Sequence, residues 1–329
     1  MSKYLRIGVS VVLLAIIAWR TNWTDVGAKF AQLNIGLWFA AVGVMVAALV
    51  ASARRWQLFA RELRFSQSLP QFCAYYFIGA YFNLLLPTSV GGDVMRVWYL
   101  NGDSGRKLAA LASVFLERLN GLLVLFFVAC FGILFTPVEL PTWIHAAVWS
   151  VTGAALAGII ALPFLRSIDK LPEQRRRQLD TMLALMKHPR ALASGTLISV
   201  FVQAMSVVCV WFLGMSIGLD VPVAYYCILA PMVGLLTLLP ISVNGVGVRE
   251  VGMIVFLAPL GVDEDSAKTL AFLWFAAGVI VSLLGGLVYL WGAQPRVQPD
   301  ALTSEGADDD RPVAGNPDQG RAGQFKNAA

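Results

Sequence analysis

The stretch NLLLPTSVGGDVMRVWYL, residues 83–100, interrupts an apolar segment with a proline, two adjacent glycines and two charged residues. Much of it returns as LTLLPISVNGVGVREV at residues 236–251. With an offset of 153 residues, Leu84–Arg96 and Thr237–Arg249 share seven identities in thirteen ungapped positions. Helix breakers and charges are each costly in lipid, so a duplicated break of this kind predicts a functional part of a membrane protein.

The composition of the chain is that of a multi-pass membrane protein. Its 329 residues are 58% hydrophobic and 14% charged, whereas soluble domains carry about 25% charged residues. A crossing of the hydrocarbon core needs about 20 apolar residues. Segments near that length are expected at 4–22, 36–53, 71–87, 108–135, 143–165, 191–217, 222–240 and 267–291.

The first apolar segment resembles a signal peptide, because Lys3 and Arg6 precede it. A small-residue cleavage site does not follow, and Trp19, Arg20 and Trp23 stand there instead. Aromatic and basic residues at this depth are typical of a membrane interface, which predicts a retained first helix.

Basic residues predict the orientation of the chain. Sixteen Lys and Arg residues fall on one face, and three fall on the other, if segments 71–87 and 222–240 each enter and leave on the same side. The positive-inside rule then predicts six full crossings, two re-entrant hairpins dipping in from opposite faces, and both termini in the cytoplasm. The expected location is the cytoplasmic (inner) membrane.

The repeat organises these crossings into two halves, about 1–140 and 141–292, within one polytopic membrane domain, 1–292. Each half holds three crossings and one broken hairpin, and an odd number of crossings inverts the second copy. The predicted fold is therefore an all-α integral membrane protein with an inverted repeat. Residues 293–329 are rich in Pro, Gly, Asp and Ala, which predicts a disordered cytoplasmic tail.

The two breaks predict a polar cavity between the halves. Freed backbone amides and helix N-termini attract anions, and Arg96 and Arg249 would add positive charge at matching positions. Glu117 lies ten residues past Lys107, about 15 Å into the membrane, where a charged residue marks a site or pathway by default. The alternative is that these charged residues only hold the two halves together. The candidate substrate-binding residues are Asn83, Ser89, Gly91, Gly92, Asp93, Arg96, Glu117, Arg118, Asn120, Asn244, Gly245, Gly247, Arg249 and Glu250.

Catalytic chemistry has little support in the sequence. The acids of the membrane region, Asp93, Glu117 and Glu250, each lie near an arginine, which favours ionised partners over proton donors. Motifs for zinc, nucleotides or a nucleophile with its base are not visible, and the four cysteines show no C-x-x-C spacing. We therefore expect no metal or other cofactor, no nucleic-acid partner and no enzymatic activity.

Three elements, NLLLPTSVGGDVMRVWYL, LERLNGLLVL and LLPISVNGVGVREVGMI, occur in this order and resemble the flippase-like membrane domain of the lysylphosphatidylglycerol synthase/flippase family. The resemblance covers about residues 5–292. It implies a lipid translocase, with roles for the matching glycines and charged residues of both breaks and for Glu117 and Arg118. The best-known members carry a soluble synthase after this domain, and nothing after residue 292 matches one, so synthase activity and a lysyl-lipid substrate are not carried over.

The function predicted from the sequence is movement of a polar lipid, anionic or aminoacylated, between membrane leaflets. Arg96 and Arg249 would hold the lipid phosphate, and Glu117 and Asp93 would balance them or meet a cationic headgroup. The expected partners are a membrane lipid and a separate synthase or envelope enzyme. The alternatives are a scaffold for such an enzyme, a membrane transferase acting on a lipid-linked substrate, and a transporter of small solutes or ions.

Overall fold

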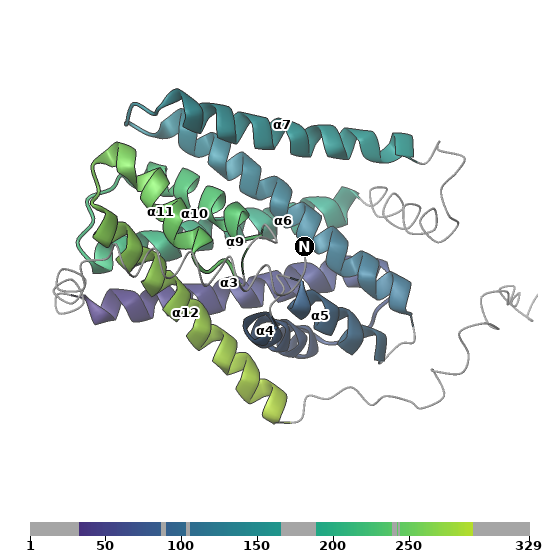
Figure 1. Ribbon diagram of the computed structural model, residues 1–329. Helices are drawn as coiled ribbons and strands as arrows, with labels where there is room; N and C mark the ends of the chain where they lie inside the picture. Colours follow the sequence, from purple (N-terminus) through teal and green to yellow (C-terminus); the bar gives the residue numbers. More distant parts are fainter. Residues whose placement is uncertain are drawn as a thin grey trace, which may run out of the picture. The chain divides into compact units, whose positions relative to one another are not determined.

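Helices form all the regular structure in the described part of the chain. The computed structural model describes residues 33–86, 90–102, 106–165, 189–238, 242 and 244–291 (Figure 1). The expected first crossing, 4–22, and the expected tail, 293–329, lie outside these residues. Among the described residues, four helices are long and apolar enough to cross a membrane: α3 (Ile35–Glu62), α6 (Lys107–Phe135), α9 (Pro189–Ser216) and α12 (Glu264–Leu290). The prediction of an all-helical membrane protein is confirmed at this level.

Shorter helices surround the two breaks. α4 (Leu69–Leu85) precedes the first break and α5 (Gly91–Gly102) follows it, while α10 (Val223–Leu238) and α11 (Val248–Leu257) flank the second. Both α4 and α10 end two residues before a proline, Pro87 or Pro240, because proline disfavours helical backbone in the preceding residue. The remaining elements are α7 (Thr142–Leu165), which coincides with the expected segment 143–165, and the 3₁₀ turn η1 (Ala258–Leu260).

Polar side chains cap the starts of α3, α4 and α12. Asn34 accepts a hydrogen bond from the Leu37 amide at 3.1 Å and caps α3, and Asp263 accepts one from the Ser266 amide at 2.8 Å and caps α12. At α4, the Gln71 side chain accepts from the Ser68 amide at 2.8 Å. Each contact satisfies an amide that has no partner within its own helix.

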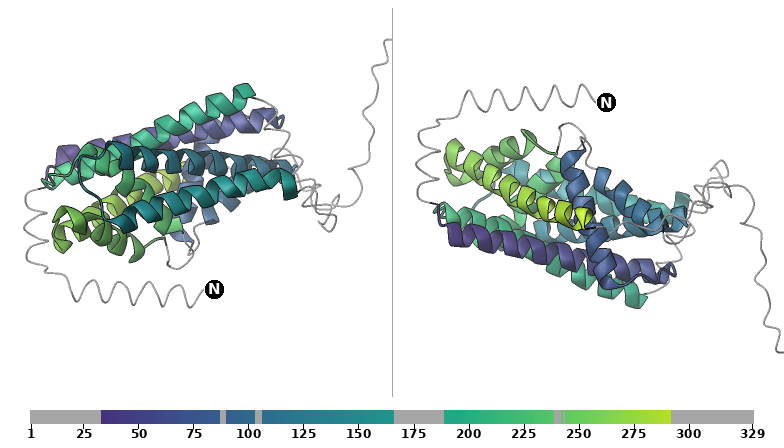
Figure 2. Two further views of the ribbon diagram at one scale, coloured as in Figure 1. Left: turned by 90° about the horizontal axis from the view of Figure 1, so that it is seen from above. Right: turned by 90° about the horizontal axis from the view of Figure 1, so that it is seen from below.

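The helix lengths repeat along the chain. α3, α4, α5 and α6 span 28, 17, 12 and 29 residues, and α9, α10, α11 and α12 span 28, 16, 10 and 27. Their packing is reciprocal as well. We call α3–α6 the first helix series and α9–α12 the second. α3 packs along α9, its counterpart in the second series, and the two lie side by side in both views of Figure 2. α4 packs on α12, and α10 packs on α6. Such exchange of partners is the contact pattern that two-fold related units make.

Among the described residues, this packing gives two large hydrophobic clusters and two small ones. One large cluster lies among α3, α4, α5 and α6, and includes Trp56, Phe72 and Tyr99. The other large cluster lies among α9, α10, α11 and α12, and extends to α7 and the far half of α6. The polar features described below lie where elements of the two series meet.

Candidate functional site

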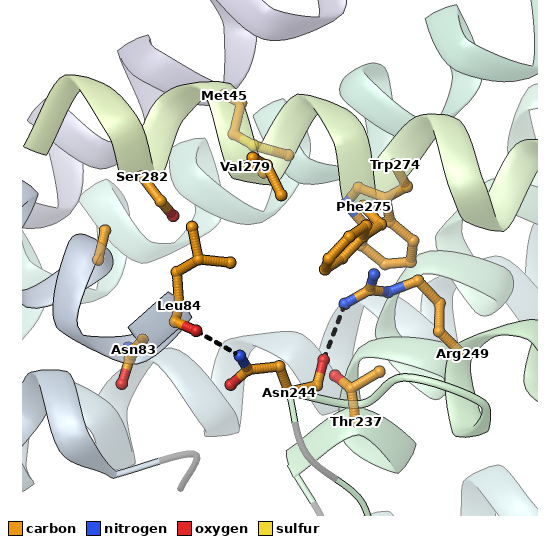
Figure 3. A pocket seen from close by; sticks show the side chains of 12 residues that line it. Met45, Asn83, Leu84, Thr237, Asn244, Arg249, Trp274, Phe275, Val279 and Ser282 are labelled. Atoms are coloured by element: carbon orange, nitrogen blue, oxygen red, sulfur yellow. Dashed lines mark hydrogen bonds between the residues drawn. The ribbon is translucent and has the colours of Figure 1, made fainter. Parts of the chain in front are cut away.

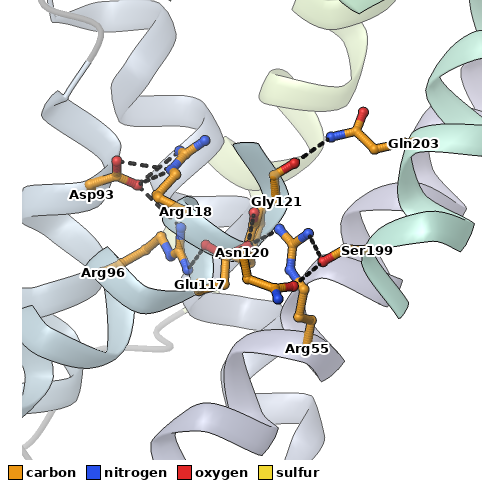
Figure 4. A network of polar contacts seen from close by, with 10 residues as sticks. Arg55, Asp93, Arg96, Glu117, Arg118, Asn120, Gly121, Ser199 and Gln203 are labelled. Carbon is orange, nitrogen blue, oxygen red and sulfur yellow. Dashed lines mark hydrogen bonds and ion pairs between the residues drawn. The ribbon is translucent and has the colours of Figure 1, made fainter. Parts of the chain in front are cut away.

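A network of buried charges surrounds Glu117 near the middle of α6 (Figure 4). The Glu117 side chain is fully buried, and its Oε2 accepts a hydrogen bond from Nη2 of Arg96 at 3.0 Å. Its Oε1 accepts from Nη2 of Arg55 and, at 3.3 Å, from the Tyr76 hydroxyl. A carboxylate buried in a membrane protein is stable only when it is paired in this way.

Asp93 extends this network from the start of α5. Its Oδ1 accepts from Nη1 of Arg96 at 3.1 Å, and both of its oxygens accept from Arg118, with Nη2 to Oδ1 at 2.8 Å and Nε to Oδ2 at 3.0 Å. The two-point contact is the strong geometry of an arginine–carboxylate pair. Three arginines therefore share two carboxylates, which leaves a net charge of +1 in the network.

Arg96 pairs with both carboxylates of the network, although its buried Nε has no hydrogen-bond partner among the described residues. Only 2% of its surface is exposed, and its guanidinium carbon lies 4.3 Å from the centre of the Trp56 ring and 4.1 Å from that of Tyr76. Aromatic faces attract a guanidinium, most strongly where water is excluded. Because both terminal nitrogens of its guanidinium already donate to carboxylates, Arg96 has less capacity for a further anion than an arginine with a terminal nitrogen unpaired.

Polar side chains carry the network into the second helix series. Nη1 of Arg55 donates to the Ser199 hydroxyl at 2.8 Å, and that hydroxyl donates to Oδ1 of Asn120. Nδ2 of Asn120 donates to the Thr196 hydroxyl at 2.9 Å. α3 and α6 are thus tied to α9 through buried hydrogen bonds.

A second polar feature is a pocket of about 270 Å³ between the two breaks (Figure 3). Helices of both series contribute to its wall, which mixes polar and apolar side chains. The described lining residues are Met45, Ala80, Asn83, Leu84, Thr237, Asn244, Arg249, Trp274, Phe275, Gly278, Val279 and Ser282. Arg96 is not among them.

Two asparagines at this pocket form hydrogen bonds with backbone groups at the ends of the helices beside the breaks. Oδ1 of Asn83, near the end of α4, accepts from the Gly92 amide at 2.6 Å. Nδ2 of Asn244 donates to the Leu84 carbonyl at 2.9 Å and so joins the second break to the first. A side chain is excluded at Gly92, because a Cβ there would lie 2.1 Å from the Gly79 carbonyl oxygen. The breaks therefore meet at close range.

The second break turns sharply before α11. Asn244 has a φ of 51°, and Gly245 and Gly247 have φ values of 71° and 83°, a region that only glycine and a few polar residues adopt readily. Oε2 of Glu250 accepts from the Gly247 amide at 2.6 Å and caps the new helix. This turn aims the first residues of α11 at the pocket.

Arg249 is the one cation among the described lining residues, and it is incompletely paired. Its Nη2 donates to the Asn244 carbonyl at 3.3 Å, and its guanidinium carbon lies 5.7 Å from the Trp274 ring centre and 5.4 Å from that of Phe275. Nη1 is buried and has no hydrogen-bond partner among the described residues. A buried donor without a partner is costly, so Arg249 has capacity for an anionic ligand.

The structure thus distributes the sequence-predicted residues over two neighbouring features. The network contains Asp93, Arg96, Glu117, Arg118 and Asn120, and the pocket is lined by Asn83, Asn244 and Arg249. Helix α5 begins with Gly91 and Gly92, the turn before α11 contains Gly245 and Gly247, and Glu250 lies in the first turn of α11. Ser89 lies outside the described residues.

Sequence reasoning missed several members of both features. Arg55 lies two residues past the expected segment 36–53, but α3 continues to Glu62 and buries its side chain. A carboxylate at membrane depth needs a cationic partner, and this requirement of Glu117 could have identified Arg55 from the sequence. Trp56, Tyr76, Trp274 and Phe275 resemble ordinary core aromatics in sequence, and only the fold brings them to an arginine.

Fold and site together define a multi-pass α-helical membrane protein with buried charges and a polar pocket between repeated elements. The chain matches the family model described as the lysylphosphatidylglycerol synthase TM region over residues 4–286, and it belongs to that family. A search of curated proteins found no match. The family relates the chain to membrane proteins of lipid modification or transport, as the sequence motifs predicted.

Proposed function

We propose that the protein moves a polar lipid between membrane leaflets and holds its phosphate at Arg249. The observation that carries this proposal is the buried Nη1 of Arg249, which has no partner among the described residues. The pocket around it is lined by Asn83, Asn244 and Ser282 on its polar part and by apolar side chains elsewhere. A mixed lining of this kind suits a headgroup whose acyl chains stay in the lipid.

The proposal includes an inverted repeat of six crossings and two re-entrant hairpins, with both termini in the cytoplasm. The repeated helix lengths and the reciprocal packing of α4 on α12 and α10 on α6 support it. In transporters with inverted repeats, the site lies at the interface of the repeats and near broken helices. The pocket is lined by residues of α3, α4, α10, α11 and α12 beside both breaks, which supports such a site. The cytoplasmic (inner) membrane is the proposed location.

We assign the network around Glu117 to holding the helices together, and the transport step to Arg249 rather than Arg96. Glu117 and Asp93 are fully engaged by arginines, and Arg96 has both carboxylates as partners. The proposed cycle makes and breaks no covalent bond. Its barrier is the transfer of a charged headgroup through the membrane, which a polar path lowers.

Leaflet exchange in proteoliposomes tests this function. The purified protein is reconstituted with a trace of acyl-labelled fluorescent phosphatidylglycerol, and dithionite quenching reports the fraction of label that reaches the outer leaflet. We expect exchange well above that of protein-free vesicles, with Arg249→Gln at least roughly tenfold slower, since hydrogen bonds to charged groups contribute about 1.5–3 kcal/mol. Arg249→Lys, the matched control, should retain part of the rate. Absence of exchange with any lipid would contradict transport and favour a scaffold.

A further inference from the structure

The charges of the pocket indicate which headgroups it accepts. Arg249 is the one charged side chain among the described lining residues. The stretches of the two breaks outside the described residues, 87–89, 239–241 and Val243, contain no acidic residue. The neutral polar groups at the pocket are amides and hydroxyls, from Asn83, Asn244, Thr237 and Ser282. A phosphate in the pocket can therefore pair with Arg249, whereas an ammonium group has no carboxylate among the described lining residues to pair with.

The nearby carboxylates are already engaged. Both oxygens of Asp93 accept from Arg118, and one also accepts from Arg96. Both oxygens of Glu117 accept from arginines. Glu250 caps α11 through the Gly247 amide and is not a lining residue. The network itself carries a net charge of +1, so its field also favours an anion.

We infer that the pocket selects lipids with a phosphate and an otherwise uncharged, compact headgroup, and discriminates against aminoacylated lipids. The inference rests on the proposed function and names the substrate class of the same site. A lysyl ester would bring ammonium groups beside Arg249 without an acid to pair them, and a like charge nearby disfavours the charged form of each group. The volume of about 270 Å³ lies just under the ~300 Å³ where ordinary ligand pockets begin, which suits a small headgroup.

A comparison of headgroups tests this selection. Proteoliposomes of neutral phosphatidylcholine receive one acyl-labelled probe each: phosphatidylglycerol, phosphatidylethanolamine or lysylphosphatidylglycerol. We expect the wild-type protein to exchange phosphatidylglycerol at least roughly tenfold faster than the lysyl lipid, the scale of one charged hydrogen bond. Phosphatidylethanolamine, which has a phosphate and an ammonium group, should also be slower than phosphatidylglycerol.

Adding a carboxylate to the pocket should reverse the preference. Asn83→Asp keeps the oxygen that accepts from the Gly92 amide and places a negative charge at the wall. We expect phosphatidylglycerol exchange to fall and lysyl-lipid exchange to rise. Ser282→Asp, on α12, makes the same change from another helix and serves if the first variant does not fold. The control is Asn34→Asp, because Asn34 caps α3 eleven residues before Met45, about 16 Å along the axis.

Failure of the selection and failure of transport give different results. Equal rates for all three lipids, or a faster lysyl lipid, would overturn the selection and leave transport standing. If no lipid exchanges, transport fails, and binding of the same probes to the detergent-solubilised protein decides the selection. Preferential binding of phosphatidylglycerol that Arg249→Gln removes supports it, and equal binding of the three probes overturns it.

Discussion

Arg96 and Arg249 stand at matching positions of the repeated stretch, yet the structure gives them opposite surroundings. Arg96 is 2% exposed, bonded to Asp93 and Glu117 and enclosed by two aromatic rings. Arg249 has one backbone carbonyl at 3.3 Å, and a buried nitrogen without a partner among the described residues. The arginine of the first break is ion-paired to two carboxylates, whereas the arginine of the second break has no ion pair among the described residues.

The difference follows from which neighbours the second copy lacks. Three residues before Arg96 stands Asp93, whereas three residues before Arg249 stands Val246. With the same offset of 153, Glu117 corresponds to Leu270 of α12, a buried apolar residue. After Lys268, α12 contains no charged residue. Arg96 therefore has carboxylate partners at its break, and Arg249 has none among the described residues that the structure pairs with it.

The largest expected loss of stability comes from removing the Glu117 carboxylate from the ionic network. Glu117→Gln would leave three buried or half-buried arginines with Asp93 alone, and loss of one partner of a buried pair costs about 3–5 kcal/mol. Thermal unfolding in detergent should show a much lower midpoint. The control is Glu264→Gln, because Glu264 is 54% exposed and pairs with Lys268 at 3.5 Å, where the cost is about 0–1 kcal/mol. Equal midpoints for the two variants would contradict a stabilising network.

A smaller effect is expected where the first break meets α4. Gly92→Ala would place a Cβ 2.1 Å from the Gly79 carbonyl and 2.7 Å from the Asn83 side chain, and overpacking of this kind costs about 1–3 kcal/mol. Because Asn83 lines the pocket, lipid exchange should fall as well. Gly43→Ala is the control, since its Cβ would meet no atom within 4 Å and alanine favours a helix. The same unfolding and exchange assays compare the two variants.

The smallest effect is expected for the hydrogen bond that joins the breaks. Asn244→Gly removes the bond to the Leu84 carbonyl but suits the φ of 51°, so the net loss should be about 0.5–1.5 kcal/mol. Lipid exchange should change more than stability, because the bond holds Asn244 beside Leu84 at the wall of the pocket (Figure 3). Unchanged exchange in this variant would show that the contact between breaks does not shape the site.

Hydropathy and breaker residues predicted most helices of the described chain. The expected segment 108–135 became Lys107–Phe135, and 222–240 became Val223–Leu238. The expected segment 36–53 ends nine residues before α3 does, because Arg54 and Arg55 resemble the charged end of a crossing. In the structure, Arg55 bonds to Glu117 and Ser199, and α3 stays buried up to Ala60. A local pattern cannot show a partner 62 residues away.

The sequence predicted many of the residues that belong to the site but not which of them contact one another. The repeat identified Arg96 and Arg249 but treated them as equivalent, since matching motifs suggest matching roles. Their different surroundings depend on Glu117, Trp274 and Phe275, which lie on α6 and α12, and only the packing of those helices sets the contacts. The backbone turn at Gly245 and Gly247, by contrast, follows from glycine itself.

Arg96→Gln and Arg249→Gln, measured side by side for unfolding midpoint and for phosphatidylglycerol exchange, separate the two arginines. Arg249→Gln should unfold like the wild type and lose exchange at least roughly tenfold. Arg96→Gln should unfold earlier, by less than Glu117→Gln because two arginines and two acids remain balanced, and should exchange lipid near the wild-type rate while folded. Wild-type exchange in Arg249→Gln, or lost exchange in a fully stable Arg96→Gln, would contradict the division between a structural and a ligand-binding arginine.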